Sequence, residues 1–181
     1  MDLNRLTIIK TYFMANWCNN TVDFIGSAET FATMAEMFTA MALKETETQQ
    51  GQLPSFYKKE GGWMHCIGFE DGLLYYDTKT CPNTDVVLAI AQHFGVGFTY
   101  RYEEMGWQFY GEVTYEDGVM TKVSLEDADF ELYEMVEEET WKFEGKEYGS
   151  EYDILDILLD RKRANATLII DAKIIDDEKE A

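Results

Sequence analysis

The chain has 181 residues, of which 46% are hydrophobic and 14% aromatic, so it is long enough and apolar enough to bury a core of its own. Its formal net charge of -20 argues against a nucleic-acid or anionic-membrane partner, because binding to phosphates depends on Lys and Arg. The three cysteines form no CxxC pair, no stretch reaches the roughly 18 apolar residues of a membrane span, and no secretory signal is recognisable. We therefore expect a cytoplasmic protein.

The first clear pattern follows an N-terminal extension, residues 1–13. From Thr21 the apolar Val22 and Phe24 alternate with polar residues, which predicts a half-buried strand that ends at Gly26. Ser27 then caps a predicted helix of about four turns, whose apolar residues recur every three or four positions as far as Ala42. The methionines of this helix are expected to fill the core.

The next segment, Lys44 to Gly62, is polar and rich in turn residues, and it predicts a long loop. Trp63–Phe69 and Leu73–Lys79 flank a short turn that contains glycine, which indicates a hairpin. Pro82 is then expected in the first turn of a second helix, which Gly95 closes.

Three further strands are predicted as an antiparallel meander, in the segments 98–103, 107–115 and 119–125. The order strand, helix, hairpin, helix, strand is that of a ferredoxin-like split βαβ sandwich, with the extra strands extending an antiparallel sheet and the helices covering one face. We therefore predict an α+β fold with a core at residues 14–125.

The composition changes after Leu125. Residues 116–160 carry sixteen acids against three bases, which is -13 of the total charge. A helix is predicted to begin near Ser150 and to end with Arg161, Lys162 and Arg163, and Thr167–Ile170 could add a strand. Residues 126–175 are predicted to be an acidic, helical C-terminal subdomain packed on the core.

The sequence offers little catalytic chemistry. His65 and Cys66 are adjacent, so on a strand their side chains would point to opposite faces, which weakens a Cys-His dyad. Neither paired metal-ligand spacing nor a glycine-rich phosphate loop is present. We assign no catalytic residue, cofactor or metal, and the sequence favours a protein that is not an enzyme.

Two blocks resemble a known family. The segment 14–20, followed by a strand and Gly26, and the later segment 98–118 with Gly111 inside a strand are similar to a ferredoxin-like family related to the plasmid protein YubB, found on plasmids and phages and in gut bacteria. The resemblance implies the ferredoxin-like fold and a bacterial mobile-element origin, but no activity. Trp17 and Cys18 are expected to pack beneath the sheet, with Asn amides holding the backbone. We interpret six residues as a structural signature: Asn16, Trp17, Cys18, Asn19, Gly26 and Gly111.

The charge distribution leads to a functional hypothesis. We expect an accessory protein that binds a basic protein partner through an acidic face, with DNA mimicry as a sharper version. The residues of this face are Glu126, Asp127, Asp129, Glu137, Glu138 and Glu139. One alternative is a small-ligand binder or enzyme with a pocket near Trp17, Cys18 and the loop before Trp63. Another is single-stranded nucleic-acid binding on an aromatic sheet face that includes Phe98, Tyr100, Tyr102, Trp107 and Phe109, although such alternation is also typical of a core.

Overall fold

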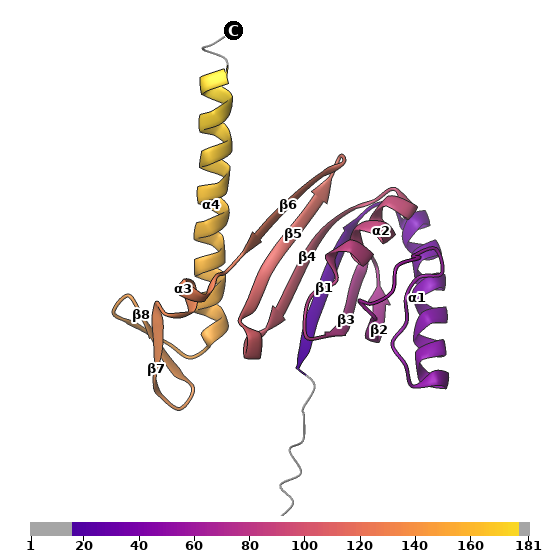
Figure 1. Ribbon diagram of the computed structural model, residues 1–181, viewed down its shortest axis with the longest axis horizontal. Coiled ribbons are helices and arrows are strands. Elements are labelled where there is room, and N and C mark those ends of the chain that lie inside the picture. Colours follow the sequence, from indigo (N-terminus) through magenta and orange to yellow (C-terminus); the bar gives the residue numbers. More distant parts are fainter. Residues whose placement is uncertain (1–15, 178–181) are drawn as a thin grey trace, which may run out of the picture.

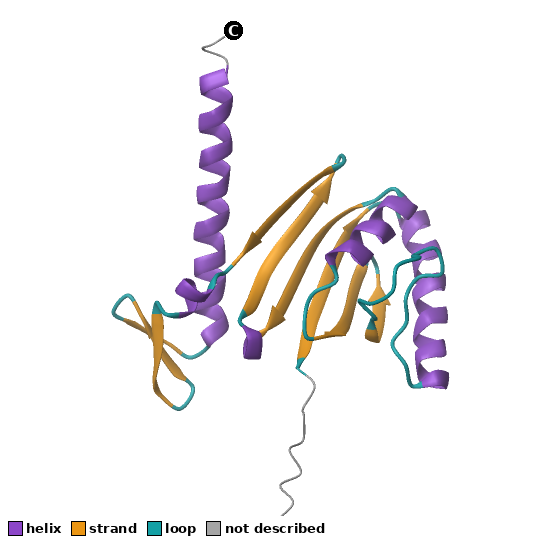
Figure 2. Cartoon of the chain, viewed as in Figure 1, coloured by secondary structure: helices purple, strands orange, loops and turns teal. Residues whose placement is uncertain are grey.

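A computed structural model describes the backbone of residues 16–177 and the side chains of residues 16–166; the extension predicted for residues 1–13 lies outside the described residues. The larger part is a six-stranded antiparallel sheet with two helices, and the smaller part is a three-stranded sheet with a long helix (Figures 1 and 2). The larger part contains β1 (Trp17–Ile25), α1 (Ala28–Thr48), β2 (His65–Glu70), β3 (Leu73–Lys79), α2 (Thr84–Phe94), β4 (Gly97–Glu104), the 3₁₀ turn η1 (Met105–Trp107), β5 (Phe109–Glu116) and β6 (Val119–Ser124). The smaller part contains α3 (Asp127–Phe130), β7 (Tyr133–Glu137), β8 (Thr140–Phe143), β9 (Lys146–Tyr148) and α4 (Glu151–Asp177).

The strand order confirms the predicted α+β fold. The six strands lie in the order β2-β3-β1-β4-β5-β6, and β1 pairs with both β3 and β4. The first four strands with α1 and α2 make the ferredoxin-like arrangement. The hairpin of β5 and β6 extends the sheet beyond β4, as the sequence predicted.

The main core lies between the sheet and the two helices. Alternate residues of β1 point inward, so Cys18, Val22 and Phe24 are buried while their neighbours along the strand are not. Met34 and Phe38 of α1 are also fully buried, which confirms that methionines fill this core. The helices therefore cover one face of the sheet and leave the other face to solvent and to the C-terminal part.

A second apolar cluster holds the C-terminal part together. Leu155 and Leu159 of α4 pack with Phe130 of α3 and Phe143 of β8. Tyr110 and Val123 border this cluster from the sheet face opposite α1 and α2, so α4 docks on that face at the β5–β6 end. The division into a core at 14–125 and a subdomain at 126–175 stays a prediction.

The first helix is longer than predicted, and the loop after it is shorter. Lys44 to Thr48 continue α1 because these polar residues suit the solvent face of a helix, and the hydroxyls of Thr46 and Thr48 donate to carbonyls one turn back. The helix ends at Gln49, whose left-handed backbone closes it by donating its N–H to Glu45 O. The Ser27 N-cap is confirmed.

Three other local predictions were wrong. Pro82 precedes the second helix instead of lying in its first turn, because Asn83 serves as the N-cap. Trp107 is not in a strand, since the Glu104 carboxylate accepts the N–H groups of Gly106 and Trp107 and caps η1. Residues 167–170 continue α4, in keeping with the helix-forming alanines around them, and add no strand.

Candidate functional site

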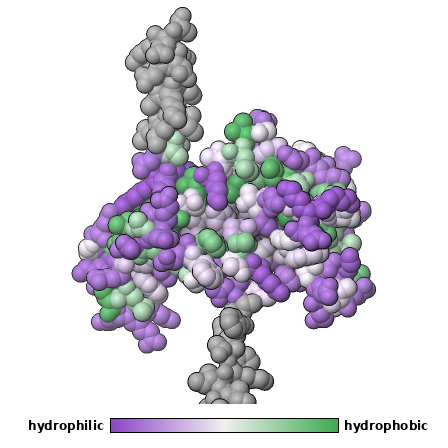
Figure 3. Space-filling view, in the orientation of Figure 1, coloured by the Kyte–Doolittle hydropathy of each residue, from purple (hydrophilic) through white to green (hydrophobic). Residues whose placement is uncertain are grey.

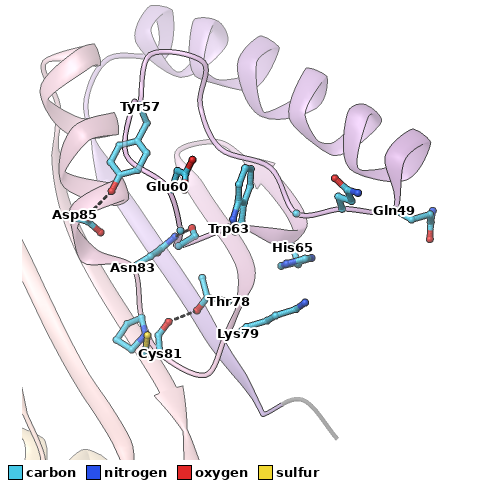
Figure 4. Close-up of a pocket in the computed structure, with 15 residues that line it drawn as sticks. Gln49, Tyr57, Glu60, Trp63, His65, Thr78, Lys79, Cys81, Asn83 and Asp85 are labelled. Carbon is cyan, nitrogen blue, oxygen red and sulfur yellow. Dashed lines mark hydrogen bonds between the residues drawn. The ribbon is translucent and has the colours of Figure 1, made fainter. Parts of the chain in front are cut away.

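A cleft lies at one end of the main sheet (Figure 4). It has a volume of about 630 Å³ and is bounded by the loop after α1, the end of β3 and the first turn of α2. Its polar and aromatic side chains include Tyr57, Glu60, Trp63, Lys79 and Asp85. The cleft is in the size range of small-molecule sites.

One wall of the cleft is fixed by Asp85 at the start of α2. The Tyr57 hydroxyl donates to Asp85 Oδ2, and the Lys59 ammonium lies 3.7 Å from the same oxygen. Burial and the neighbouring Asp85 carboxylate raise the pKa of Tyr57 to about 12, so its hydroxyl stays a proton donor at neutral pH. This pair holds the loop against α2.

A glycine pair presents Trp63 at the cleft. Gly61 and Gly62 both have positive φ angles, 93° and 69°, a backbone conformation that glycine adopts without strain. Asn83 Nδ2 donates to Gly62 O at 2.7 Å and anchors this turn to the α2 N-cap. Trp63 is 49% exposed, and its ring stands between Glu60 and His65 in Figure 4.

A buried polar network lies behind the cleft. The Tyr100 hydroxyl donates to Asn20 Oδ1 at 2.6 Å, and Tyr76 donates to Asn83 Oδ1 at 2.5 Å. Asn20 Nδ2 donates to Thr78 Oγ1 at 3.1 Å and to Cys18 O at 2.7 Å. Burial raises the pKa of both Tyr76 and Tyr100 well above the usual value, so the network is neutral. Its role is to hold β1, β3 and α2 in register.

A shallower groove beside the cleft contains Trp17. Its ring meets the His65 ring edge-on at 5.0 Å, and the Lys79 ammonium lies 5.9 Å from its centroid. Trp17 is 40% exposed, so the prediction that it packs beneath the sheet was wrong. Consecutive strand residues face opposite ways, and only Cys18 of this pair is buried.

The adjacent His65 and Cys66 also depart from the expected geometry. Cys66 has a positive φ of 54° at a bulge in β2, and its N–H donates to Glu45 Oε1 at 2.8 Å. The bulge allows both residues to line the same groove instead of opposite faces. Within residues 16–166, no group of three or more His, Cys, Asp or Glu side chains is arranged to hold a metal ion.

The Cys18 thiol is buried and is not suited to act as a nucleophile. Burial raises its pKa to about 12, so the thiolate that a nucleophile needs is not formed near neutral pH. Cys81 is exposed and lines the cleft, while Cys66 is exposed in the groove.

The remaining signature residues fall in separate places. Asn16 accepts the Thr80 N–H through its backbone carbonyl, and the exposed Asn19 side chain donates to Glu103 Oε1 at 3.2 Å. Gly26 permits close packing, because a Cβ there would come 2.8 Å from Val96. Gly111 leaves room for the Tyr102 hydroxyl.

The six residues of the predicted acidic face also divide into two groups. Around α3, Asp129 lies 2.7 Å from the Lys162 ammonium and accepts the Glu126 N–H, while Glu126 lies 3.6 Å from Lys162. Asp127 is exposed beside them. These acids cap α3 and attach it to α4.

The other group lies on the hairpin of β7 and β8, which we call the acidic hairpin and define as residues 133–143. Glu137, Glu138 and Glu139 surround its turn, and Glu134 precedes them on β7. All four are exposed, and none forms an ion pair with another described residue. Met135 is 65% exposed on the same strand, and apolar patches interrupt the hydrophilic surface of the C-terminal part in Figure 3.

The aromatic strand face does not offer a stacking surface. Phe98, Tyr100 and Tyr102 point toward the helices and are buried, so they cannot stack on bases. Trp107 and Phe109 are exposed at the other end of this segment.

The sequence did not predict the buried network, and of the four hairpin glutamates it singled out Glu137, Glu138 and Glu139 but not Glu134. Asn20 lies on the same face of β1 as Cys18 and Val22, so its amide points into the core and needs hydrogen-bond partners there. Asn83 and Tyr76 carry no comparable local signal, because they meet Asn20 and Tyr100 only through the tertiary fold.

No helix within the described residues is long and apolar enough to cross a membrane. Comparison with curated proteins and with solved structures gives no match to this chain. A family model does match, over a segment that runs from the loop before β2 to the turn after β8 and includes the acidic hairpin. Residues 59–144 are similar to the ferredoxin-like domain in Api92-like protein.

Proposed function

We propose that this protein is a non-enzymatic accessory protein that binds a basic protein partner through its acidic hairpin. The observation that carries the proposal is the set of four exposed glutamates, at positions 134, 137, 138 and 139, none of which forms an ion pair with a described residue, with Lys142 opposite Glu134 as the one base in residues 133–143. Other acids of this region form ion pairs with α4. Glu144 holds Arg161 through two hydrogen bonds of 2.7 and 2.8 Å, and Asp129 holds Lys162.

The hairpin also supplies apolar contact area. Met135 and Val136 are exposed between the glutamates, and β7 is an edge strand whose one partner among residues 16–177 is β8. Protein interfaces combine apolar area with complementary charge, which steers association and selects the partner. A basic surface with an apolar centre is therefore the partner that this hairpin fits.

The sharper version of the proposal is DNA mimicry. In that case the partner is a DNA-binding protein, and the glutamates take the place of phosphates at its basic site. Captured proteins would then be released by duplex DNA as well as by salt.

The experiment is affinity capture from a lysate of the source organism at low and at high salt. The variant replaces Glu134, Glu137, Glu138 and Glu139 with Gln, and the matched control replaces Glu29, Glu36, Glu47 and Glu70, which are also exposed, so that both lose four charges. The proposal predicts a salt-sensitive partner that the hairpin variant loses and the control retains. Capture of no salt-sensitive partner, or equal loss in both variants, would overturn it.

A relationship to the YubB-type family is a separate proposal. It is supported by the two sequence blocks at 14–20 and 98–118, and by the family match over residues 59–144, which contains the second block.

A second candidate function, small-ligand binding, is favoured by the cleft beside Trp63. It is lined by titratable groups from four elements of the chain, and Trp17 and Trp63 are both accessible near it. Its test is to follow the NMR signal of the Trp63 indole N–H while small molecules are added. If no class of ligand shifts this signal, small-ligand binding at the cleft is excluded.

A further inference from the structure

We infer that the cleft is a binding site for a neutral saccharide, with Trp63 as the stacking platform. This inference rests on the second candidate function and is independent of the acidic hairpin. A sugar ring has one apolar face and many hydroxyls that both donate and accept hydrogen bonds. The cleft must therefore provide a flat apolar surface, mixed donors and acceptors, and no excess charge.

The flat surface is the indole of Trp63. Half of this side chain is accessible, and the two residues before it are glycines, so no neighbouring side chain on that stretch shields the ring. The hydrogen bond from Asn83 to Gly62 O fixes the turn that carries it. An aromatic ring held in this way binds at a low cost in conformational entropy.

The donors and acceptors come from other side chains that line the cleft. Gln50 has an amide that offers both, Glu60 offers acceptors, and the Lys79 ammonium offers donors. None of these three side chains has a hydrogen-bond partner among the described residues. Their polar atoms are therefore available to hydroxyl groups of a ligand in the cleft, although the Lys79 ammonium also lies 5.9 Å from the centroid of the Trp17 ring.

The charges around the cleft nearly balance. The carboxylates of Glu60 and Asp85 oppose the ammonium groups of Lys59 and Lys79, and Asp85 is already engaged by Tyr57 and Lys59. The α2 N-terminus has Asp85 in its first turn, which disfavours an anion there. A phosphate or another strongly charged ligand is therefore poorly matched, and a neutral polyhydroxylated ring is well matched.

The test is NMR observation of the Trp63 indole N–H in the full chain while maltotriose, cellotriose and chitotriose are added to millimolar concentration. Uridine monophosphate and arginine serve as charged probes. Trp63→Ala is compared with Trp107→Ala, because Trp107 is also an exposed indole but lies on η1, outside the residues that line the cleft.

We expect a saturable shift of the Trp63 signal with at least one trisaccharide. The two variants are compared by isothermal titration calorimetry with the same trisaccharide, since Trp63→Ala has no indole signal to observe. Trp63→Ala should weaken binding at least about tenfold, because truncation of a central aromatic anchor has effects of this size, and Trp107→Ala should leave it unchanged. Glu60→Gln keeps an acceptor and should weaken binding less than Trp63→Ala.

A shift caused by a charged probe but by no trisaccharide would overturn the saccharide assignment and leave ligand binding at the cleft standing. Absence of a shift with every probe would overturn both. Equal loss in the Trp63 and Trp107 variants would show that the ligand does not stack on Trp63, and would also overturn the inference.

Discussion

At the scale of single residues, the inward-facing amide of Asn20 joins more of the fold than any signature residue singled out from the sequence. It donates to β1 and β3 and accepts from Tyr100 on β4, so one side chain links three strands. Asn19 beside it faces outward and makes one exposed bond to Glu103. Adjacent asparagines therefore have different roles because a strand alternates its side chains.

Asn20→Ala should lower the free energy of unfolding by about 2–3 kcal/mol, because the buried Tyr100 hydroxyl loses its acceptor and the buried Thr78 hydroxyl loses a donor, although Tyr100 still accepts from Asn83 N–H and Thr78 still donates to Cys81 O. The matched Asn19→Ala should change it by about 0.5 kcal/mol or less, since its bond is exposed. Chemical denaturation of both variants measures the difference. Equal losses would contradict the assigned roles.

Gly111 has a steric role on the helix-covered face of the sheet. A Cβ at this position would overlap the Tyr102 hydroxyl and come 2.8 Å from Val123 O. Gly111→Ala should therefore cost about 1–3 kcal/mol, as overpacked cores do. Gly149→Ala, where no atom lies within 4 Å of the added Cβ, is the control and should be close to neutral in the same thermal melts.

The titration of buried groups sets the response to alkali. Folding raises the pKa of Cys18 from 9.0 to about 12 and also raises the pKa of Tyr76 and Tyr100, in each case chiefly through burial. A raised pKa contributes stability that is complete below the unfolded value and is lost as pH rises toward the folded value.

We therefore expect the urea concentration at the midpoint of unfolding to decrease as pH rises above 9, where the Cys18 thiol of the unfolded chain begins to ionise. Cys18→Ala should remove part of this fall. A midpoint that rises with alkali would contradict the assigned burial.

At the scale of secondary-structure elements, α4 is joined to the main sheet through a polar contact. Glu112 of β5 is 7% exposed, and its carboxylate lies 2.9 Å from Arg101 Nε and 3.1 Å from an Arg163 guanidinium nitrogen on α4. The Tyr110 hydroxyl donates to Asp156 on the same helix at 2.7 Å. Together with the apolar cluster, these bonds place the C-terminal part on the open sheet face.

Glu112→Gln should lower hydrogen-exchange protection in the N-terminal half of α4 by about 1–2 kcal/mol, because both guanidinium groups lose an anion but keep some access to water. The amides of α1 should be unaffected and serve as the internal control. Loss of protection in α1 to the same extent would mean that Glu112 supports the whole fold instead of this contact.

The sequence predicted the elements that have strong periodicity and missed those that depend on distant partners. Alternation along β1 and β4, the hairpin signal at β2 and β3, and the apolar stripes of α1 and α2 together predicted the ferredoxin-like order. The end of α1 was misplaced because Lys44 to Thr48 are polar in both a loop and a solvent-facing helix turn. A pocket at the loop before Trp63 was one of the alternatives that the sequence suggested, but Cys18 is buried and does not line it. The bulge at Cys66 and the position of the cleft against α2 could not be predicted, since each depends on a segment far away in the chain, Glu45 for the bulge and Asn83 for the cleft.

At the scale of the whole molecule, some of the acidic side chains form ion pairs and others do not. The acids that follow Leu125 include some that hold the C-terminal part together, such as Glu144 and Asp129, and the four glutamates of the acidic hairpin, which form no ion pair with a described residue. Glutamates that have no ion-pair partner repel one another, which lowers the stability of the folded state. Such a surface charge also favours solubility and selects partners of opposite charge.

Site-specific photo-crosslinking tests this account most directly. A photoreactive amino acid is placed at Glu138 on the acidic hairpin and, as a control, at Glu36 on the exposed side of α1. The account predicts a crosslink from position 138 to a protein with a basic surface, suppressed by high salt and absent from position 36. No crosslink from position 138, or equal crosslinks from both positions, would contradict it.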